Sequence, residues 1–328
     1  MKKRKRLKRK RLAIFCVLLV VVVFILGNYL IGLISGLNVQ LMELQGNSIN
    51  GAESPGEYIP FAVNDDVLSY GDVNFSMYSQ QALLINLTTG EVMFEHGADE
   101  RVNPASLTKI MTVLVGIEQA RSDTMIVRAD FTGLMLANAT MAGFEYGEER
   151  ILMDVLHGAM LPSGADATST IAYNVASSYE AFVELMNERA RTLGMDNTNF
   201  TNASGLHNEF HYTSAYDMAI LLRHALDNPT FREVFTAKDY SFTTLFGEKR
   251  VMKSTLFANM RTTEFVGGEI IGGRTGFTIP AGRCLASFAT NGEDEFILIT
   301  FGADQYEVNQ TAHIFDAFTI YEYFLNMN

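Results

Sequence analysis

The pattern of apolar and polar residues divides residues 76–328 into strand-like ends and a helical middle. Residues 81–96, QALLINLTTGEVMFEH, contain two apolar runs on either side of LTTG, which predicts a β-hairpin. Residues 106–120 are apolar at almost every position, and this predicts a buried helix. Residues 283–303 contain two further apolar runs joined by NGED, in which Asn-Gly is a typical hairpin turn.

Between these ends, the apolar residues recur with helical spacing, and the C-terminal stretch does the same. Strands at both ends with helices between them predict an α+β domain whose two ends meet in one sheet. The chain has no internal repeat. The segments with helical spacing are 151–160, 165–178, 180–193, 214–226 and 312–328.

The first 34 residues have a different pattern, which is typical of a membrane anchor. Residues 2–11 contain nine Lys or Arg, and residues 12–34, LAIFCVLLVVVVFILGNYLIGLI, contain no charge. That run forms roughly 35 Å of helix, enough to span a bilayer. A cleavable signal peptide is the alternative, but SGLNVQLMEL offers no A-x-A-like cleavage site. We therefore expect a single-pass protein of the cell membrane, with a basic cytoplasmic tail at 1–11, a transmembrane signal anchor at 12–34 and an extracytoplasmic body.

Residues 35–75 are rich in Gly, Ser, Asn and Pro, which predicts an extracytoplasmic stalk before a domain at 76–328. Without the tail, 16 basic residues face 37 acidic ones, a formal charge of about −21. A body this acidic argues against nucleic acid as a partner. Cys16 lies in the apolar segment and Cys284 in the apolar stretch CLASFAT, so neither an extracytoplasmic intrachain disulfide nor a cysteine metal site is expected.

The candidate chemistry begins with a polar pair inside the apolar stretch 106–120. Ser106 and Lys109 are three residues apart, so they lie on one helical face. Asn103-Pro104 indicates that the helix begins here, and the positive end of its dipole then favours an oxyanion at Ser106. Burial and the same dipole favour a neutral Lys109, a candidate general base. A Ser-x-x-Lys match alone is weak, because it arises about once by chance in such a chain.

Two further motifs follow along the chain. Ser163, in MLPSGADA, lies in a short turn between predicted helices, which can direct a hydroxyl into a cleft. Arg274, Thr275 and Gly276, in GGRTGFT, lie in the strand-rich part, where a cation and a hydroxyl can hold a carboxylate. The joint order Ser-x-x-Lys, Ser-Gly-x, Arg-Thr-Gly is that of penicillin-binding proteins and serine β-lactamases.

The sequence resembles the low-molecular-mass penicillin-binding proteins, the serine D-alanyl-D-alanine carboxypeptidases, over about residues 78–325. The resemblance implies a serine β-lactamase/transpeptidase-like α+β fold, with an antiparallel sheet flanked by helices, a helical subdomain and the active site between them. It implies removal of the terminal D-Ala from peptidoglycan pentapeptides, inhibition by β-lactams, and no metal or organic cofactor. The stretches that carry it are INLTTGEVMFEHGADERVNPASLTKIMT, LPSGADA, NFTNASGLHNEFHYTSAYDMAILLRHAL and GGRTGFTIPAGRCLASFAT.

The resemblance also implies a role for each polar residue of the first two motifs. Ser106 would attack the carbonyl of the penultimate D-Ala, and Lys109 would be its base. Ser163 would relay a proton to the leaving D-Ala. Water would then release the acyl group from Ser106.

For the third motif, the resemblance places the substrate's terminal carboxylate on Arg274 and Thr275. The N–H groups of Ser106 and Phe277 would form the oxyanion hole, with Gly276 allowing close approach. Arg274 stands where the family usually has Lys. It keeps the charge but is bulkier and does not lose its proton, so we expect it to anchor the carboxylate and not to act as an acid or base.

Ala165 is a second departure, because the family usually has Asn at this third position of Ser-x-Asn. That amide bonds the acyl side of the substrate and helps to orient the lysine. Loss of one such contact costs on the order of 1 kcal/mol, which predicts slower or altered chemistry. It also leaves open a membrane-tethered protein that kept the fold and lost the activity.

Other interpretations also stand beside the carboxypeptidase. A class A β-lactamase needs a glutamate that activates the deacylating water, and Glu184, the candidate, lies in a predicted helix and not in a loop. Transpeptidation differs only in its acceptor, so the sequence does not separate it from hydrolysis. HNEFH, residues 207–211, lacks the glutamate position of the H-E-x-x-H zinc motif, and we expect loop histidines there.

Overall fold

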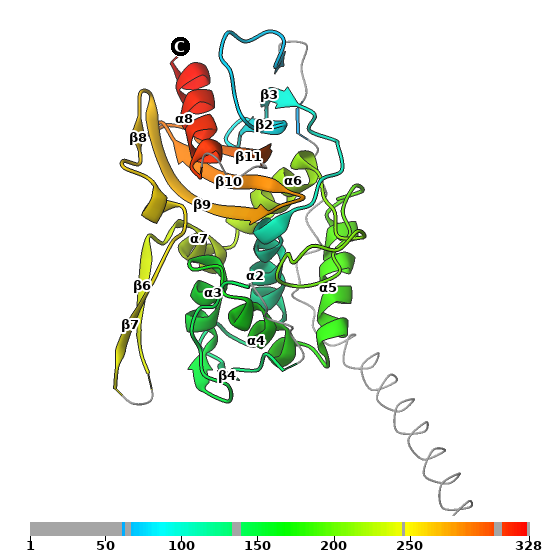
Figure 1. Cartoon of the computed structure of the whole chain (residues 1–328), viewed down its shortest axis with the longest axis vertical. Helices are drawn as coiled ribbons and strands as arrows, with labels where there is room; N and C mark the ends of the chain where they lie inside the picture. The colour runs from blue at the N-terminus through cyan, green and yellow to red at the C-terminus, as the bar shows by residue number, and fades with distance from the viewer. Residues whose placement is uncertain (1–60, 63–66, 133–138, 245–246, 305–309, 327–328) are drawn as a thin grey trace, which may run out of the picture. The chain divides into compact units, whose positions relative to one another are not determined.

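The structure is a computed structural model that describes residues 61–62, 67–132, 139–244, 247–304 and 310–326 (Figure 1). The tail predicted at 1–11, the anchor predicted at 12–34 and most of the stalk predicted at 35–75 lie outside the described residues. No helix within the described ranges is long and apolar enough to cross a bilayer.

Within these ranges, seven strands form one sheet in the order β1-β3-β2-β11-β10-β9-β8. The strands are antiparallel to their neighbours, except that β1 and β3 are parallel. Both predicted hairpins are present, and β2 pairs with β11, so the two ends of the domain meet in one sheet as expected. The strand bounds are β1 Leu68–Ser69, β2 Gln81–Asn86, β3 Val92–His96, β8 Glu264–Phe265, β9 Gly268–Thr278, β10 Gly282–Thr290 and β11 Glu295–Ala303.

The two faces of this sheet are covered by different helices (Figure 1). Successive strand residues point to opposite faces, so Leu83 packs in the same core as α2 (Thr108–Gln119) and α6 (Ala215–Leu226). Leu84 packs on the opposite face with α8 (Ala312–Leu325). Both faces are therefore apolar, as the nearly continuous apolar runs of β2, β10 and β11 require.

Further helices extend the layer that contains α2, and two small two-stranded sheets, β4–β5 and β6–β7, accompany them (Figure 1). Gly116 decides how closely α2 packs on α4, because a Cβ there would lie 2.7 Å from Cγ2 of Ile171. The helices predicted at 151–160, 165–178 and 180–193 are confirmed to within a few residues, whereas the short helix α7 was not predicted. The remaining bounds are η1 Ala105–Leu107, β4 Ile126–Arg128, β5 Glu149–Ile151, α3 Leu152–Met160, α4 Ala165–Val175, α5 Tyr179–Thr192, α7 Pro229–Thr236, β6 Asp239–Thr243, β7 Lys249–Lys253 and η2 Phe257–Asn259.

The folded body begins earlier than the expected boundary at residue 76. Phe61 is buried, and its ring meets that of Tyr216 edge-on at 5.6 Å between centroids. Val67 packs against the same core, and β1 pairs with β3. Part of the segment predicted as a stalk therefore belongs to the domain. Its apolar residues are too scattered to form a pattern in the sequence, and they pack against residues that are distant in the chain.

Candidate active site

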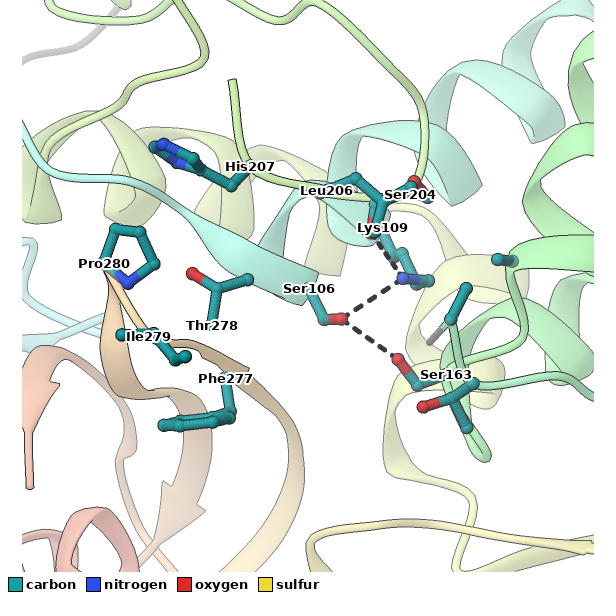
Figure 2. A pocket seen from close by; sticks show the side chains of 14 residues that line it. Ser106, Lys109, Ser163, Ser204, Leu206, His207, Phe277, Thr278, Ile279 and Pro280 are labelled. Carbon is teal, nitrogen blue, oxygen red and sulfur yellow. Dashed lines mark hydrogen bonds between the residues drawn. The ribbon is translucent and has the colours of Figure 1, made fainter. Parts of the chain in front are cut away.

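A cavity of about 360 Å³ opens where the end of β9 faces the starts of α2 and α4 (Figure 2). The Ser-x-x-Lys and Ser-Gly-x motifs both reach it, although their serines are 57 residues apart in the chain. Its lining residues are Ser106, Lys109, Ala139, Thr140, Ser163, Ala165, Ser204, Gly205, Leu206, His207, Phe277, Thr278, Ile279 and Pro280.

Ser106 lies in the short turn η1, which leads directly into α2. Its neighbour Ala105 has a φ of +45°, a left-handed conformation that costs a non-glycine residue roughly 1–3 kcal/mol. The hydroxyl of Thr108 donates to the carbonyl of Ala105 at 2.8 Å and holds this conformation. Oγ of Ser106 consequently lies 3.2 Å from Nζ of Lys109 and 3.1 Å from Oγ of Ser163 (Figure 2).

Lys109 is only 3% exposed. Its Nζ donates to the carbonyl of Ser204 at 2.5 Å. Burial lowers the pKa of Lys109 well below its usual value, the charge of Arg274 lowers that pKa further, and the carboxylate of Asp166 opposes the shift. A neutral amine with one N–H on Ser204 keeps a lone pair for the Ser106 hydroxyl, which is the geometry of a general base.

Next to Ser106 and Lys109, a hydrogen bond connects Ser163 to Arg274. Ser163 has a φ of +71°, and its Oγ accepts a hydrogen bond from Nη2 of Arg274. The guanidinium also donates from Nη1 to the carbonyl of Met160 at 2.7 Å and from Nε to the carbonyl of Ser106 at 3.3 Å. Arg274 is 1% exposed and does not line the cavity. The guanidinium of Arg274 is thus bonded to groups of the protein itself. From the sequence, we expected it to contact the substrate carboxylate directly.

The next three residues of β9 bring that strand against the serine. A Cβ at Gly276 would lie 3.0 Å from the backbone nitrogen of Ser106, so glycine permits the close approach. Phe277 follows and lines the cavity (Figure 2). The hydroxyl of Thr275 lies 2.7 Å from that of Thr255 and, like Arg274, Thr275 is not part of the cavity lining.

Residues 70–305 match the D-alanyl-D-alanine carboxypeptidase family, peptidase family S11. That match spans more than two thirds of the chain and includes all three motifs. The chain belongs to this family.

Individual relatives agree with that assignment. DacF, the D-alanyl-D-alanine carboxypeptidase of Bacillus subtilis, is 36% identical over 230 residues, which are 69% of this chain and 57% of DacF. DacC of Escherichia coli, another D-alanyl-D-alanine carboxypeptidase, is 30% identical over 231 residues, 67% of this chain and 56% of DacC. The chain therefore matches less than two thirds of the length of either protein. The Streptomyces K15 DD-transpeptidase has a TM-score of 0.69 at 26% identity, over 78% of this chain and 100% of that one, which confirms the transpeptidase-like α+β fold.

In this S11 chain, Ala165 lies at the start of α4, is 2% exposed and lines the cavity. Its N–H donates to the carbonyl of Thr140 at 2.8 Å. The methyl group provides no hydrogen bond to Lys109 or to a ligand. Next to it, the carboxylate of Asp166 accepts hydrogen bonds from three successive backbone N–H groups, at residues 142–144, and fixes the neighbouring loop.

His211 is a residue of the site that the sequence interpretation treated only as part of a loop. Nδ1 accepts a hydrogen bond from the N–H of Thr201 at 3.0 Å, so in the neutral ring the proton is on Nε2. Nε2 lies 2.8 Å from the hydroxyl of Thr108, which in turn donates to the carbonyl of Ala105. Burial lowers the pKa of His211 to about 4, and the neutral ring holds the turn of Ser106. The five-residue spacing of HNEFH gave no sign of this, because Thr108 is 103 residues away.

The other residues weighed in the sequence have ordinary environments. His207 is exposed at the cavity, and Cys284 is buried in β10, where burial raises the pKa of its thiol to about 12. Among the described residues, no three His, Cys, Asp or Glu side chains are grouped closely enough to hold a metal ion.

Proposed function

We propose that this chain is a serine-type D-Ala-D-Ala carboxypeptidase, which removes the terminal D-Ala from peptidoglycan stem peptides through an acyl-enzyme on Ser106. The observation that carries the proposal is the hydroxyl of Ser106 between the amine of Lys109, at 3.2 Å, and the hydroxyl of Ser163, at 3.1 Å, in one cavity. Membership of the S11 family supports it, as do relatives that are named D-alanyl-D-alanine carboxypeptidases.

Acylation begins when Oγ of Ser106 attacks the carbonyl carbon of the penultimate D-Ala. The proton of the hydroxyl moves to Nζ of Lys109, which burial and the nearby Arg274 favour in its neutral form. The new Oγ–C bond places a negative charge on the carbonyl oxygen. The N–H groups of Ser106 and Phe277 are the proposed donors to that oxygen, at the point where β9 approaches the turn of the serine.

Breakdown of the tetrahedral intermediate requires a proton on the departing nitrogen. Ser163 is the proposed relay, because its hydroxyl lies 3.1 Å from Oγ of Ser106 and also accepts from Arg274. The fixed positive charge of the guanidinium favours release of the Ser163 proton and its replacement from Lys109. The C–N bond breaks, D-Ala leaves, and water activated by the regenerated Lys109 amine then hydrolyses the acyl-serine.

The test is Ser106-dependent chemistry on two kinds of ligand. Residues 58–328, which form a compact unit by themselves, are expected to gain the mass of one penicilloyl group with excess penicillin and to release D-Ala from an acyl-D-Ala-D-Ala peptide. Ser106→Ala should abolish both, whereas Ser122→Ala, at an exposed serine outside the cavity, should abolish neither. D-Ala release that persists in Ser106→Ala would contradict the proposal.

A transpeptidase is the second candidate, favoured by the similarity to the Streptomyces K15 DD-transpeptidase. It would use the same acyl-enzyme but transfer the acyl group to an amine. Adding glycylglycine as an acceptor distinguishes the two, because a transpeptidase forms the new peptide in preference to the free acid. A protein that kept the fold without activity, the hypothesis raised by Ala165, would show no Ser106-dependent change with either ligand.

We further propose that residues 12–34 anchor the protein in the cell membrane with the domain outside. The support is the uncharged run of residues 12–34 after nine basic residues. The full chain should sediment with membranes and lose its domain to protease added outside the cell. Residues 58–328 expressed alone should remain in the supernatant.

A further inference from the structure

Most polar side chains in the lining of the cavity already have hydrogen-bond partners in the protein. The hydroxyl of Ser106 is bonded to Lys109 and Ser163. The hydroxyl of Ser204 donates to Oδ1 of Asn202 at 3.1 Å. Such a group exchanges one partner for another when a ligand enters, so its net contribution to binding is small.

The hydroxyl of Thr140 is different from these groups. Thr140 lines the same cavity and is exposed, and none of the described residues forms a hydrogen bond with its hydroxyl. In contrast, Nδ1 of His207 lies 3.2 Å from the side-chain amide nitrogen of Asn103. The hydroxyl of Thr278 accepts from the N–H of Ala281 at 3.2 Å. An exposed hydroxyl without a protein partner bonds water, and a ligand that displaces this water has to supply the partner.

The backbone of Thr140 is held in place by the start of α4. Its carbonyl accepts from the N–H of Ala165 at 2.8 Å, so the two residues lie side by side in the cavity wall. A Cβ at Gly164 would lie 2.7 Å from the backbone nitrogen of Ala142, which shows that the loop packs directly on this end of the helix. The carboxylate of Asp166 accepts from three N–H groups of the same loop. The position of Thr140 is therefore fixed before a ligand arrives, which lowers the entropic cost of binding.

The substrate brings a second peptide group into the cavity together with the bond that is cleaved. Its nitrogen is bonded to the Cα next to the carbonyl carbon that Ser106 attacks, so this nitrogen and that carbon are about 2.5 Å apart. The methyl group of Ala165 lines the cavity and can neither donate to this peptide group nor accept from it. A peptide group that loses water without gaining a partner weakens binding. The hydroxyl of Thr140, next to Ala165, is the partner that this part of the wall can provide.

We propose that Thr140 is a specificity-determining residue, whose hydroxyl binds the peptide group on the acyl side of the penultimate D-Ala. This inference rests on the proposed carboxypeptidase function. A hydroxyl can donate to the C=O of that peptide group or accept from its N–H. A side chain of the neighbouring loop thereby supplies the hydrogen bond that Ala165 lacks. A cavity wall that contains alanine at this place thus still binds a peptide in preference to an apolar acyl chain.

The test compares two ligands that differ only in that peptide group. One is acyl-D-Ala-D-Ala, and the other carries CH2–CH2 in place of CO–NH on the acyl side of the penultimate residue. Each is measured on residues 58–328 by how strongly it slows the acylation of Ser106 by penicillin, so that neither ligand has to be cleaved. Thr140→Val should raise the inhibition constant of the peptide roughly 5- to 15-fold and leave that of the analogue unchanged, because only the peptide loses a hydrogen bond. Thr140→Ser keeps the hydroxyl and should retain most of the parent affinity. The control is Thr262→Val, at an exposed threonine outside the cavity, which should change neither constant.

Each other outcome contradicts a definite statement. If Thr140→Val binds the peptide as tightly as the parent protein does, the inference is overturned, whereas D-Ala release by the parent protein leaves the carboxypeptidase proposal intact. Equal weakening of both ligands, or equal weakening by Val and Ser, would also overturn it, because Thr140 would then act on the shape of the cavity and not through its hydroxyl. If the parent protein neither binds the peptide nor releases D-Ala from it, the proposed function itself fails, and the inference fails with it.

Discussion

At the scale of single residues, Thr108 connects a strained turn to a buried histidine. Its hydroxyl accepts from Nε2 of His211 and donates to the carbonyl of Ala105, each at 2.8 Å. Thr108→Val keeps the shape but leaves the Nε2–H donor unpaired, which costs roughly 1–3 kcal/mol. We expect acylation of Ser106 by penicillin to slow about 10-fold or more, measured as adduct mass against time.

Thr108→Ser is the matched control for that change, because it retains the hydroxyl and loses only a methyl group. It should acylate at close to the parent rate. Equal slowing in the Ser and Val variants would show that packing, and not the hydrogen-bond chain, holds the Ser106 turn.

The protonation of Lys109 gives a second prediction at this scale. Arg274 lowers the pKa of Lys109, so replacing Arg274 by Gln removes a repelling charge and raises that pKa. Because the neutral amine is the base, the acid limb of the kcat/KM profile should move to higher pH in Arg274→Gln. Arg274→Lys keeps the charge and should leave the limb near its original position, whereas an unmoved limb in the Gln variant would contradict the coupling.

At the scale of elements, the contact between α2 and α4 sets the distance between the two active-site serines. Each serine lies at or just before the start of its helix, and Gly116 lets the helices approach. Alanine favours a helix by about 1 kcal/mol over glycine, but here its Cβ would lie 2.7 Å from the buried Ile171 side chain. A clash in a packed core costs roughly 1–3 kcal/mol, so Gly116→Ala should lower the free energy of unfolding overall.

The matched experiment is a double-mutant cycle with Ile171→Ala, followed by urea unfolding. Ile171→Ala costs stability by itself, but it removes the side-chain atoms that the new methyl group of Gly116→Ala would meet. The double variant should therefore be less destabilised than the sum of the two single variants, by roughly 1 kcal/mol or more. If the two changes in the free energy of unfolding simply add in the double variant, the clash is absent and α2 and α4 move apart without strain.

At the scale of the whole molecule, the sequence predicted what depends on local pattern. The β2–β3 and β10–β11 hairpins and the buried helix α2 follow from apolar runs and a turn signal that are contiguous in the chain. The hairpin β6–β7 was not predicted, because most of its side chains are exposed or half-buried and show no clear alternation. The surroundings of Arg274 were not predictable either, since its partners Ser106, Met160 and Ser163 are 111 to 168 residues away.

Two buried histidines, His211 and His313, make the stability of the protein depend on pH. His211 lies beside the Ser106 turn, near His207 and Lys109, and His313 lies at the start of α8 near Arg283. Both have a pKa of about 4 in the folded state, lowered chiefly by burial, against about 6.5 in an unfolded chain. Between these values the unfolded state binds more protons, so stability is lost as the pH falls below about 6.5.

That difference predicts a loss of about 2 kcal/mol per histidine between pH 7 and pH 5, measured by urea unfolding at the two pH values. His313→Gln removes one of the two groups and should reduce the acid-induced loss by about that amount, whatever its effect at pH 7. If the parent protein and the His313→Gln variant lose the same stability on acidification, the fold does not hold His313 neutral.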